Sequence, residues 1–425
     1  MALMTGRRLV LLPVVLAIGL SAEAAAEEAS RPDAAPAAPA VAAPHRPWNE
    51  VETSWISVRL GMALLEDGAF YSQNAPSIQQ VGDIPSEALF RLEDLSLSGE
   101  IKWTHPWTYE VSGNYKGLDP TDTRGWTFTN IYLSIPLGSF GWVTVGKQKE
   151  GVGMEMMANA RDLPFMEHST MTTASTFVAS HVAGVRLWGS PMGGRLTWSA
   201  GWFNNWLEDG KSFRQSGSIF AGRVTGLAVE EDGDRRLLHL GASAVYRESQ
   251  DGSFRSKSVP EVYEAPEFVD TGSFPANHAT SYGAELAAVE GPVTLSGEVT
   301  RTSVSAPERG NPDFYGFYVM TSWTITGESR PYRRANGTFG AISPASPFSF
   351  SHGGPGAWEL AARYSSVDLT SGAIQGGRFD RLSGAVSWRP TRQWRLEFNY
   401  GYGRLDRSGL AGRTRFYQFR LQFEL

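Results

Sequence analysis

The C-terminal segment, residues 414–425, constrains the fold most, because apolar and polar side chains alternate through it up to the final residue. The apolar row consists of Tyr417, Phe419, Leu421, Phe423 and Leu425. Successive side chains of a strand point to opposite faces, so this segment predicts a strand with one apolar and one charged face. Aromatic residues on the apolar face of a strand that ends the chain are typical of the closing strand of a transmembrane β-barrel.

The N-terminal segment predicts export. Arg7 and Arg8 precede an apolar run over residues 9–20, and small residues follow up to Ala26. The run is too short to span a bilayer as a helix, and the small residues suit cleavage by a signal peptidase. We therefore expect a signal peptide over residues 1–26; the alternative is an N-terminal membrane anchor.

The rest of the chain divides into a tail and one large domain. Residues 27–48 are rich in Ala and Pro and contain almost no large apolar side chain, which predicts a disordered tail. We expect residues 49–425 to form the barrel. No later segment is a continuous apolar run long enough for a transmembrane helix, yet the chain has 14 Trp, 14 Tyr, 22 Phe and 46 Gly. A barrel explains this combination because it hides apolar residues by alternation.

Two features of the composition exclude classes of function. The chain has no Cys, so disulfides, thiolate metal sites and cysteine nucleophiles are ruled out. Its net charge of −6 argues against nucleic acid as a partner. The seven His show no spacing typical of a catalytic triad or a metal site, so we expect neither a catalytic residue nor a metal or other cofactor.

Alternating segments recur along the whole of the large domain. Strands are expected at residues 55–65, 89–104, 107–116, 126–136, 140–148, 182–189, 195–204, 218–229, 237–248, 282–289, 293–304, 314–326, 358–369, 379–390, 394–405 and 415–425. Three long connections interrupt the series. The fold class predicted is therefore all-β, a transmembrane antiparallel barrel of about sixteen strands, and that size leaves an aqueous bore.

The polar rows of these strands predict which side chains face water. An Arg or Lys that faces lipid at the bilayer centre costs about 2–4 kcal/mol, so charged residues should point inward. We expect six cations to line the lumen wall: Arg59, Lys102, Arg195, Arg363, Arg381 and Arg395. The alternative is that these charges pair with acidic residues across strands and only keep the lumen wet.

The connection at residues 149–181 is the best place for a constriction. It carries five of the ten Met residues, and such an apolar loop is expected to fold inward against the wall. An ordinary extracellular loop is the alternative. Lys149, Arg161 and Arg186 are our candidates for anion binding at the narrowed point, because Arg and Lys form charge-assisted hydrogen bonds with oxyanions.

Four blocks of sequence resemble the phosphate-selective porin O and P family. Residues 149–155 read Lys-Glu-Gly-Val-Gly-Met-Glu, similar to the family's Lys-Glu-Pro-Phe-Gly-Leu-Glu, and residues 165–168 resemble its Phe-Met-Glu-Arg with His168 in place of Arg. Residues 325–332 are similar to its Leu-Thr-Gly-Glu-x-Arg-x-Tyr block. Residues 358–369 are similar to its Trp-Glu-Leu-Ala-x-Arg-Tyr-Ser…Asp-Leu block.

The resemblance implies a homotrimeric porin in the lipid of the bacterial outer membrane, through which small anionic solutes such as phosphate or polyphosphate diffuse passively. From the residues themselves we expect passive diffusion of small hydrophilic solutes with a preference for anions. Alternatives that remain open are a general non-selective porin, a plugged structural barrel, a catalytic barrel and, for the fold, a soluble pair of β-sandwiches.

Overall fold

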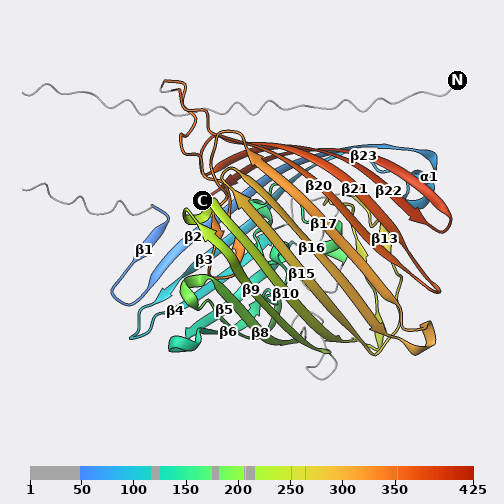
Figure 1. Ribbon diagram of the computed structural model, residues 1–425, viewed down its shortest axis with the longest axis horizontal. Helices are drawn as coiled ribbons and strands as arrows, with labels where there is room; N and C mark the ends of the chain where they lie inside the picture. The colour runs from blue at the N-terminus through green and yellow to red at the C-terminus, as the bar shows by residue number, and fades with distance from the viewer. Residues whose placement is uncertain are drawn as a thin grey trace, which may run out of the picture. The chain divides into compact units, whose positions relative to one another are not determined.

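The computed structural model describes residues 48–115, 125–174, 181–204, 206, 216–249, 251–263, 265–351 and 353–425. The predicted signal peptide and nearly all of the Ala/Pro-rich tail lie outside the described residues. Within the described residues, a 17-stranded sheet includes sixteen strands that close into an antiparallel barrel (Figure 1). The predicted fold class is confirmed.

Nine strands form the first part of the barrel, and each pairs with the next along the chain. They are β2 (Ser57–Gln73), β3 (Glu87–Ile101), β4 (Trp107–Tyr115), β5 (Trp126–Pro136), β6 (Trp142–Gln148), β7 (Val182–Gly189), β8 (Leu196–Asn204), β9 (Ser218–Glu231) and β10 (Arg236–Glu248). A short strand that we did not predict, β1 (Glu50–Glu52), pairs with the start of β2.

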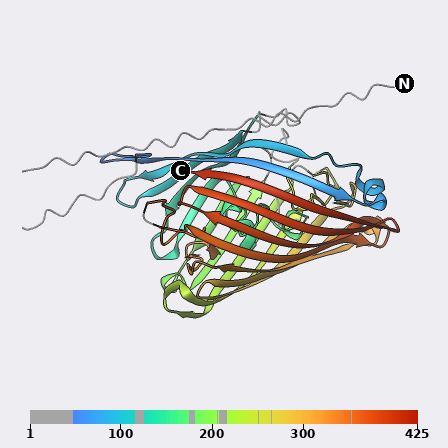
Figure 2. The same ribbon diagram turned by 90° about the horizontal axis from the view of Figure 1, so that it is seen from above.

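Seven strands complete the barrel. They are β15 (His278–Glu290), β16 (Val293–Ser305), β17 (Asp313–Thr324), β20 (Ala357–Ser371), β21 (Ile374–Arg389), β22 (Trp394–Arg407) and β23 (Leu410–Glu424). Strand β23 pairs with β2 from Ala63↔Glu424 to Gln73↔Thr414, which closes the sheet; Figure 2 shows the blue β2 beside the red C-terminal strands. Each predicted strand overlaps an observed one, and the differences lie at the ends, where alternation weakens.

The barrel wall exposes its apolar side chains and buries its charged ones, which is the reverse of the distribution in a soluble protein. In β22, Leu396 and Phe398 are 42% and 36% exposed, whereas Arg395 and Glu397 are 1% and 4% exposed. A soluble protein buries its apolar side chains and exposes its charged ones. The inverted order fits a barrel whose outer surface contacts lipid and whose polar face points inward.

Consecutive connections alternate between the two ends of the barrel. We call the end at which β23 finishes the C-terminal rim and the other end the opposite rim, where helix α1 (Ala75–Val81) lies (Figure 1). Helix α1 begins after Asn74, whose side chain accepts a hydrogen bond from the Ser77 N–H at 3.1 Å. Shorter 3-10 turns occur at η1 (Gly138–Phe140), η3 (Met192–Gly194), η4 (Gly233–Arg235) and η5 (Pro307–Arg309).

Three long connections contact the inner face of the wall. Loop A (residues 149–181) leaves the opposite rim and contains α2 (Met154–Met157), η2 (Ala160–Asp162) and α3 (Thr170–Ala174). Loop B (residues 249–277) leaves the same rim and contains the short strands β11 (Ser253–Phe254), β12 (Lys257–Ser258), β13 (Val269–Asp270) and β14 (Phe274–Pro275). Loop C (residues 325–356) leaves the C-terminal rim and contains β18 (Tyr332–Arg333) and β19 (Thr338–Phe339).

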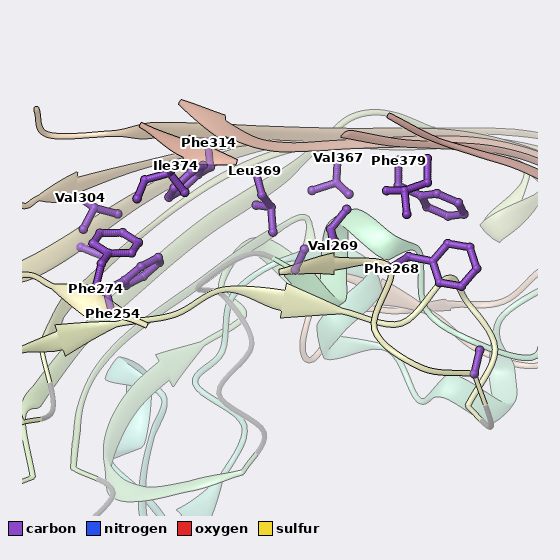
Figure 3. Packing of buried hydrophobic residues seen from close by; sticks show 14 of the residues in the cluster. Phe254, Phe268, Val269, Phe274, Val304, Phe314, Val367, Leu369, Ile374 and Phe379 are labelled. Atoms are coloured by element: carbon purple, nitrogen blue, oxygen red, sulfur yellow. The ribbon is translucent and has the colours of Figure 1, made fainter. Parts of the chain in front are cut away.

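Loop B is held by an apolar cluster on the inner face of the later strands (Figure 3). The Phe268 ring lies 5.1 Å from that of Phe379, and the Phe254 ring stacks on Phe314 at 6.2 Å. Full burial of one such side chain is worth about 1.5–3 kcal/mol. Apolar packing therefore fills much of the barrel interior beside these strands.

Within the described part of the chain, no helix has the length and apolar character needed to cross a membrane.

Candidate permeation site

A cavity of about 590 Å³ lies against the inner face of the earlier strands, from β3 to β9, and is bounded on its other side by loops A and C. Some of the inner residues of β5, β6 and β7 near this cavity are small. Thr144 faces Ser134 across the sheet, and Gly146 faces Gly184. A Cβ atom at Gly146 would come within 2.1 Å of the Ile131 carbonyl oxygen, so only glycine fits that position.

The cavity is lined by more cations than carboxylates. Its basic residues are Lys149, Arg161, Arg186, Arg223 and Arg333, and its acidic residues are Asp94 and Glu110. The structure thus brings our three constriction candidates together at one cavity, although they come from the start of loop A, from η2 and from β7. They line the same cavity because loop A folds into the barrel.

Arg186 is the cation most available to a solute. Its guanidinium makes no hydrogen bond or ion pair with any residue that the structure describes, and its buried Nε has no partner. The guanidinium carbon lies 5.9 Å from the centre of the Trp188 ring, within range of a cation–π contact. An unpaired charge in a desolvated site attracts an opposite charge more strongly than it would in water.

Lys149 is fixed by the backbone of its own loop. Its Nζ donates to the Met156 carbonyl at 2.7 Å and to the Ala158 carbonyl at 2.9 Å. Loss of hydration lowers the pKa of Lys149 to about 8, and the nearby positive charge of Arg161 acts in the same direction. Lys149 therefore carries a positive charge at neutral pH, but a rise of about one pH unit begins to remove it.

The other three cations of the cavity have acidic partners. Arg161 lies 2.9 Å from Asp94, Arg223 lies 2.7 Å from Glu285, and Arg333 lies 2.6 Å from Asp162. These pairs balance charge locally. The Arg161–Asp94 pair fastens loop A to strand β3 of the wall, and the Arg333–Asp162 pair joins loop C to loop A.

The Glu110 carboxylate, which lines the cavity, is held by three side-chain hydrogen bonds. It accepts hydrogen bonds from Ser112 at 2.9 Å, from Asn130 at 2.7 Å and from the Tyr132 hydroxyl at 2.8 Å. These three donors fix the orientation of the carboxylate. The cavity therefore presents one fixed negative charge on the same stretch of wall as Arg186.

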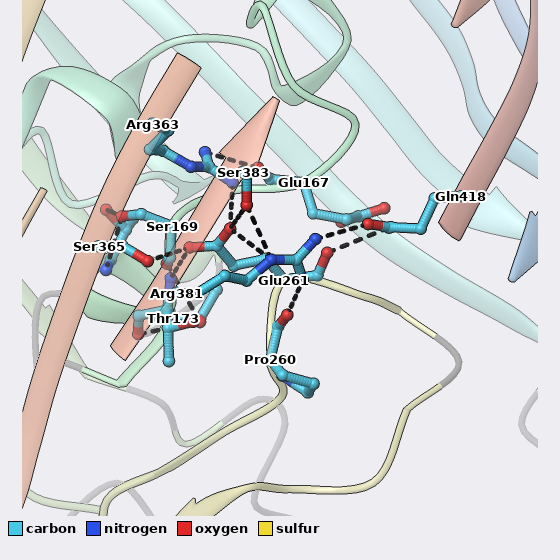
Figure 4. Close-up of polar contacts among 12 residues, drawn as sticks. Glu167, Ser169, Thr173, Pro260, Glu261, Arg363, Ser365, Arg381, Ser383 and Gln418 are labelled. Carbon is cyan, nitrogen blue, oxygen red and sulfur yellow. Dashed lines mark hydrogen bonds and ion pairs between the residues drawn. The ribbon is translucent and has the colours of Figure 1, made fainter. Parts of the chain in front are cut away.

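Three of the predicted wall cations lie on the inner face but do not line this cavity. Arg363 is buried and lies 2.7 Å from Glu261 (Figure 4). It also lies 3.2 Å from Glu155, with its guanidinium over the Phe165 ring. Arg381 donates to the Pro260 carbonyl and to Gln418 (Figure 4). Arg395 lies 2.7 Å from Glu397 and donates to the Arg161 carbonyl. These cations hold loops A and B in place.

The other three predicted wall cations lie at the C-terminal rim. Arg59 is paired with Glu50 at 2.9 Å, and Lys102 is paired with Glu52, both of which belong to β1. Arg195, which lies in the turn before β8, is 3.5 Å from Glu230. All three are at least partly exposed, so they contribute charge at one mouth of the barrel.

Sequence reasoning did not single out several residues of the cavity. Glu110, Tyr132 and Arg223 stand in polar rows of strands, so alternation could have identified them. Arg333 lies in loop C, where no periodicity assigns a face. Trp188 stands in the polar row of β7 but is apolar, and only the structure shows its ring at the cavity.

Two His residues line the cavity and stay neutral at pH 7. Burial lowers the pKa of His168, and it lowers the pKa of His181 to about 3. Among the described residues, no group of three or more His, Cys, Asp or Glu side chains is placed to hold a metal ion.

Comparison with known proteins identifies the family. The family described as "Phosphate-selective porin O and P" matches residues 69–425. Porin O of Pseudomonas aeruginosa is 23% identical over 346 residues, which cover 74% of this chain and 73% of that protein. An uncharacterized protein of Caulobacter vibrioides is 32% identical over 176 residues, which cover 40% of this chain and only 34% of that protein's length.

Solved structures share the barrel at low sequence identity. The anion-selective porin from Comamonas acidovorans superposes with a TM-score of 0.57 at 12% identity, covering 87% of this chain and 100% of that one. The trimer form of OmpT from Vibrio cholerae superposes with a TM-score of 0.54 at 12% identity, covering 88% and 100%. With the family match over most of the barrel, these findings show that the chain belongs to the phosphate-selective porin O and P family and is a porin of the bacterial outer membrane.

Proposed function

We propose that this porin lets small hydrophilic solutes diffuse passively across the outer membrane and that it prefers anions. The observation that carries the proposal is the unpaired guanidinium of Arg186 in the cavity wall. Lys149 adds a second positive charge at neutral pH, and three further cations stand nearby with acidic partners. The family's description and the anion-selective porin from Comamonas acidovorans support the same preference.

The physical basis is the replacement of hydration. An anion that enters the cavity loses part of its water shell, and Arg186 and Lys149 supply charge-assisted hydrogen bonds in return. Passage also requires that binding stay weak enough for exit. Glu110 keeps the local field from becoming strongly positive, which favours release.

The remaining predicted cations have supporting roles in this proposal. Arg59, Lys102 and Arg195 are each paired with a carboxylate at the C-terminal rim, so they add little net charge at that mouth. Arg363, Arg381 and Arg395 set the shape of the lumen wall because they fasten the inner loops to it. Phosphate is the solute suggested by the family's description. A general non-selective porin is the second candidate, because Asp94 and Glu110 line the same cavity as the cations.

Reversal-potential recordings in planar bilayers test the proposal. We expect a potential that indicates anion preference under a KCl gradient, and a reduced chloride current when phosphate, sulfate or pyrophosphate is added. Equal permeation of cations and anions would instead establish the general porin. A preference for cations would contradict the proposal.

We further propose that the chain assembles as a homotrimer, as in the trimer form of OmpT, and that residues 1–26 are removed during export. Mass measurement of the purified protein in detergent checks the first statement. N-terminal sequencing of the mature protein checks the second, and a mature chain that still begins at Met1 would contradict it.

A further inference from the structure

We infer that the cavity binds singly charged organic anions with an aromatic body, such as aryl carboxylates, more tightly than it binds inorganic phosphate. Arg186 would hold the anionic group and Trp188 the ring. The inference rests on the proposed anion passage and names the class of solute for that same site.

The first observation is a fixed aromatic ring beside the free cation. Arg186 and Trp188 are two residues apart on β7, so their side chains share the inner face, and both line the cavity. The Trp188 Nε1–H donates to the Thr144 hydroxyl at 2.9 Å. Its ring stacks on that of Trp142 at 5.8 Å, with only 11° between the planes. These two contacts hold the indole in one orientation before any solute arrives.

The second observation is the chemistry of loop A where it lines the cavity. Met156 and Met157 of loop A line the same cavity. Thioethers are polarizable and make favourable contacts with aromatic rings. A volume of about 590 Å³ lies in the range of cavities that hold small organic ligands. Ring-shaped solutes would therefore meet apolar contacts from the wall and from the loop.

The third observation is the balance of free charge. Inorganic phosphate is hydrated on every oxygen, so a site that dehydrates it must replace many hydrogen bonds. Here Arg186 is unpaired, the Lys149 ammonium already donates to two carbonyls, and Glu110 repels a second negative charge. An aryl carboxylate needs polar partners at only one end. The cavity matches that division into one charged end and one apolar body.

The test uses the purified full-length protein in planar bilayers, with a constant chloride gradient and one added anion at a time. Benzoate is the aromatic probe, acetate is the carboxylate without a ring, and phosphate is the inorganic anion. We expect benzoate to halve the chloride current at a concentration about tenfold below that of acetate, because stacking on Trp and burial of the ring add to the same charge interaction. Phosphate should halve the chloride current only at a higher concentration than benzoate does.

Matched variants assign the effect to the ring. Trp188→Leu should bring the half-blocking concentrations of benzoate and acetate together, and Trp188→Phe, which keeps a ring, should restore part of the difference. Trp358→Leu is the control, because Trp358 faces outward and stacks on Trp388. It should leave the ratio of the two concentrations unchanged.

The possible results distinguish failure of the organic-anion inference from failure of the proposed function. If the channel prefers anions but benzoate blocks no better than acetate, or phosphate blocks best, the organic-anion inference is overturned and the proposed function stands. If Trp188→Leu keeps the full benzoate preference, the assignment to Trp188 is wrong. A cation-selective channel would overturn both the inference and the proposed function.

Discussion

The Arg363 Nη2 atom lies 2.7 Å from the Glu261 Oε2 atom and so joins strand β20 to loop B across the interior of the barrel. The same guanidinium lies 3.2 Å from Glu155 and donates to the Glu167 carbonyl, both in loop A. Burial alone would raise the pKa of Glu261, but the positive charges of Arg363 and Arg381 outweigh that effect and hold the pKa below its usual value. One buried cation therefore anchors two loops.

Substitution of Arg363 by Gln should destabilise the folded barrel. Glu155 and Glu261 would both lose this cation, although Glu261 would keep Arg381 at 3.4 Å. Breaking a buried ion pair from one side costs about 3–5 kcal/mol. We expect the folded form to convert to the unfolded form at a lower temperature, measured by the mobility shift on a denaturing gel. Single-channel currents should also become noisier as loops A and B loosen.

An exposed ion pair provides the control for this prediction. Arg404 lies 3.1 Å from Asp406, and both side chains are largely accessible, so Arg404→Gln should change stability by no more than about 1 kcal/mol. Adding Glu261→Gln to Arg363→Gln should recover part of the loss, because one uncompensated charge disappears. Equal shifts for Arg363→Gln and Arg404→Gln would contradict the anchoring role.

Substitution of Arg186 by Gln should reduce anion preference. The change removes the unpaired cation of the cavity while keeping a side chain of similar length. The reversal potential under a KCl gradient should move toward zero or change sign. Arg59→Gln, which removes an exposed cation already paired with Glu50 at the rim, should have a much smaller effect. A larger shift for Arg59→Gln would place the selective point at the mouth.

Anion preference should fall as pH rises from about 7 to about 9. Lys149 has a pKa of about 8, so it is largely protonated at the lower pH and largely neutral at the higher one. Loss of this positive charge from the cavity weakens the preference for anions. Reversal potentials measured across this range should show a step centred near pH 8.

Lys149→Arg separates this residue from other groups that titrate nearby. Burial raises the pKa of Glu150 to about 7, and its partner Arg247 opposes that rise, so Glu150 also changes charge close to this range. Arginine stays protonated throughout, so the variant should lose the step near pH 8. A step that persists in Lys149→Arg would assign it to Glu150 or to another group.

A charge placed on the outer face should impair folding into bilayers. Leu382 is 58% exposed at the middle of β21, where the surrounding medium is lipid. Leu382→Arg should cost about 2–4 kcal/mol at this depth, measured as a lower folding yield into phospholipid vesicles. Leu382→Met should fold as the parent does. Normal folding of the Arg variant would show that this face does not contact lipid.

The sequence by itself determined the wall of the barrel. Alternation is a local property, because each residue's face follows from its neighbours two positions away, so the number of strands and their inner and outer faces were predictable. For example, the alternation of side chains along the last strand was enough to place Phe419 outward and Arg420 inward.

Only the tertiary structure decided which inward cations are open to solute. Arg186 and Arg363 both stand in polar rows and look equivalent in sequence. Arg363 meets Glu261, which is 102 residues away in loop B, whereas no described residue forms a hydrogen bond or ion pair with Arg186. The course of a long loop depends on the total of its distant contacts and not on any local period. The free charge of the pore is therefore a consequence of packing.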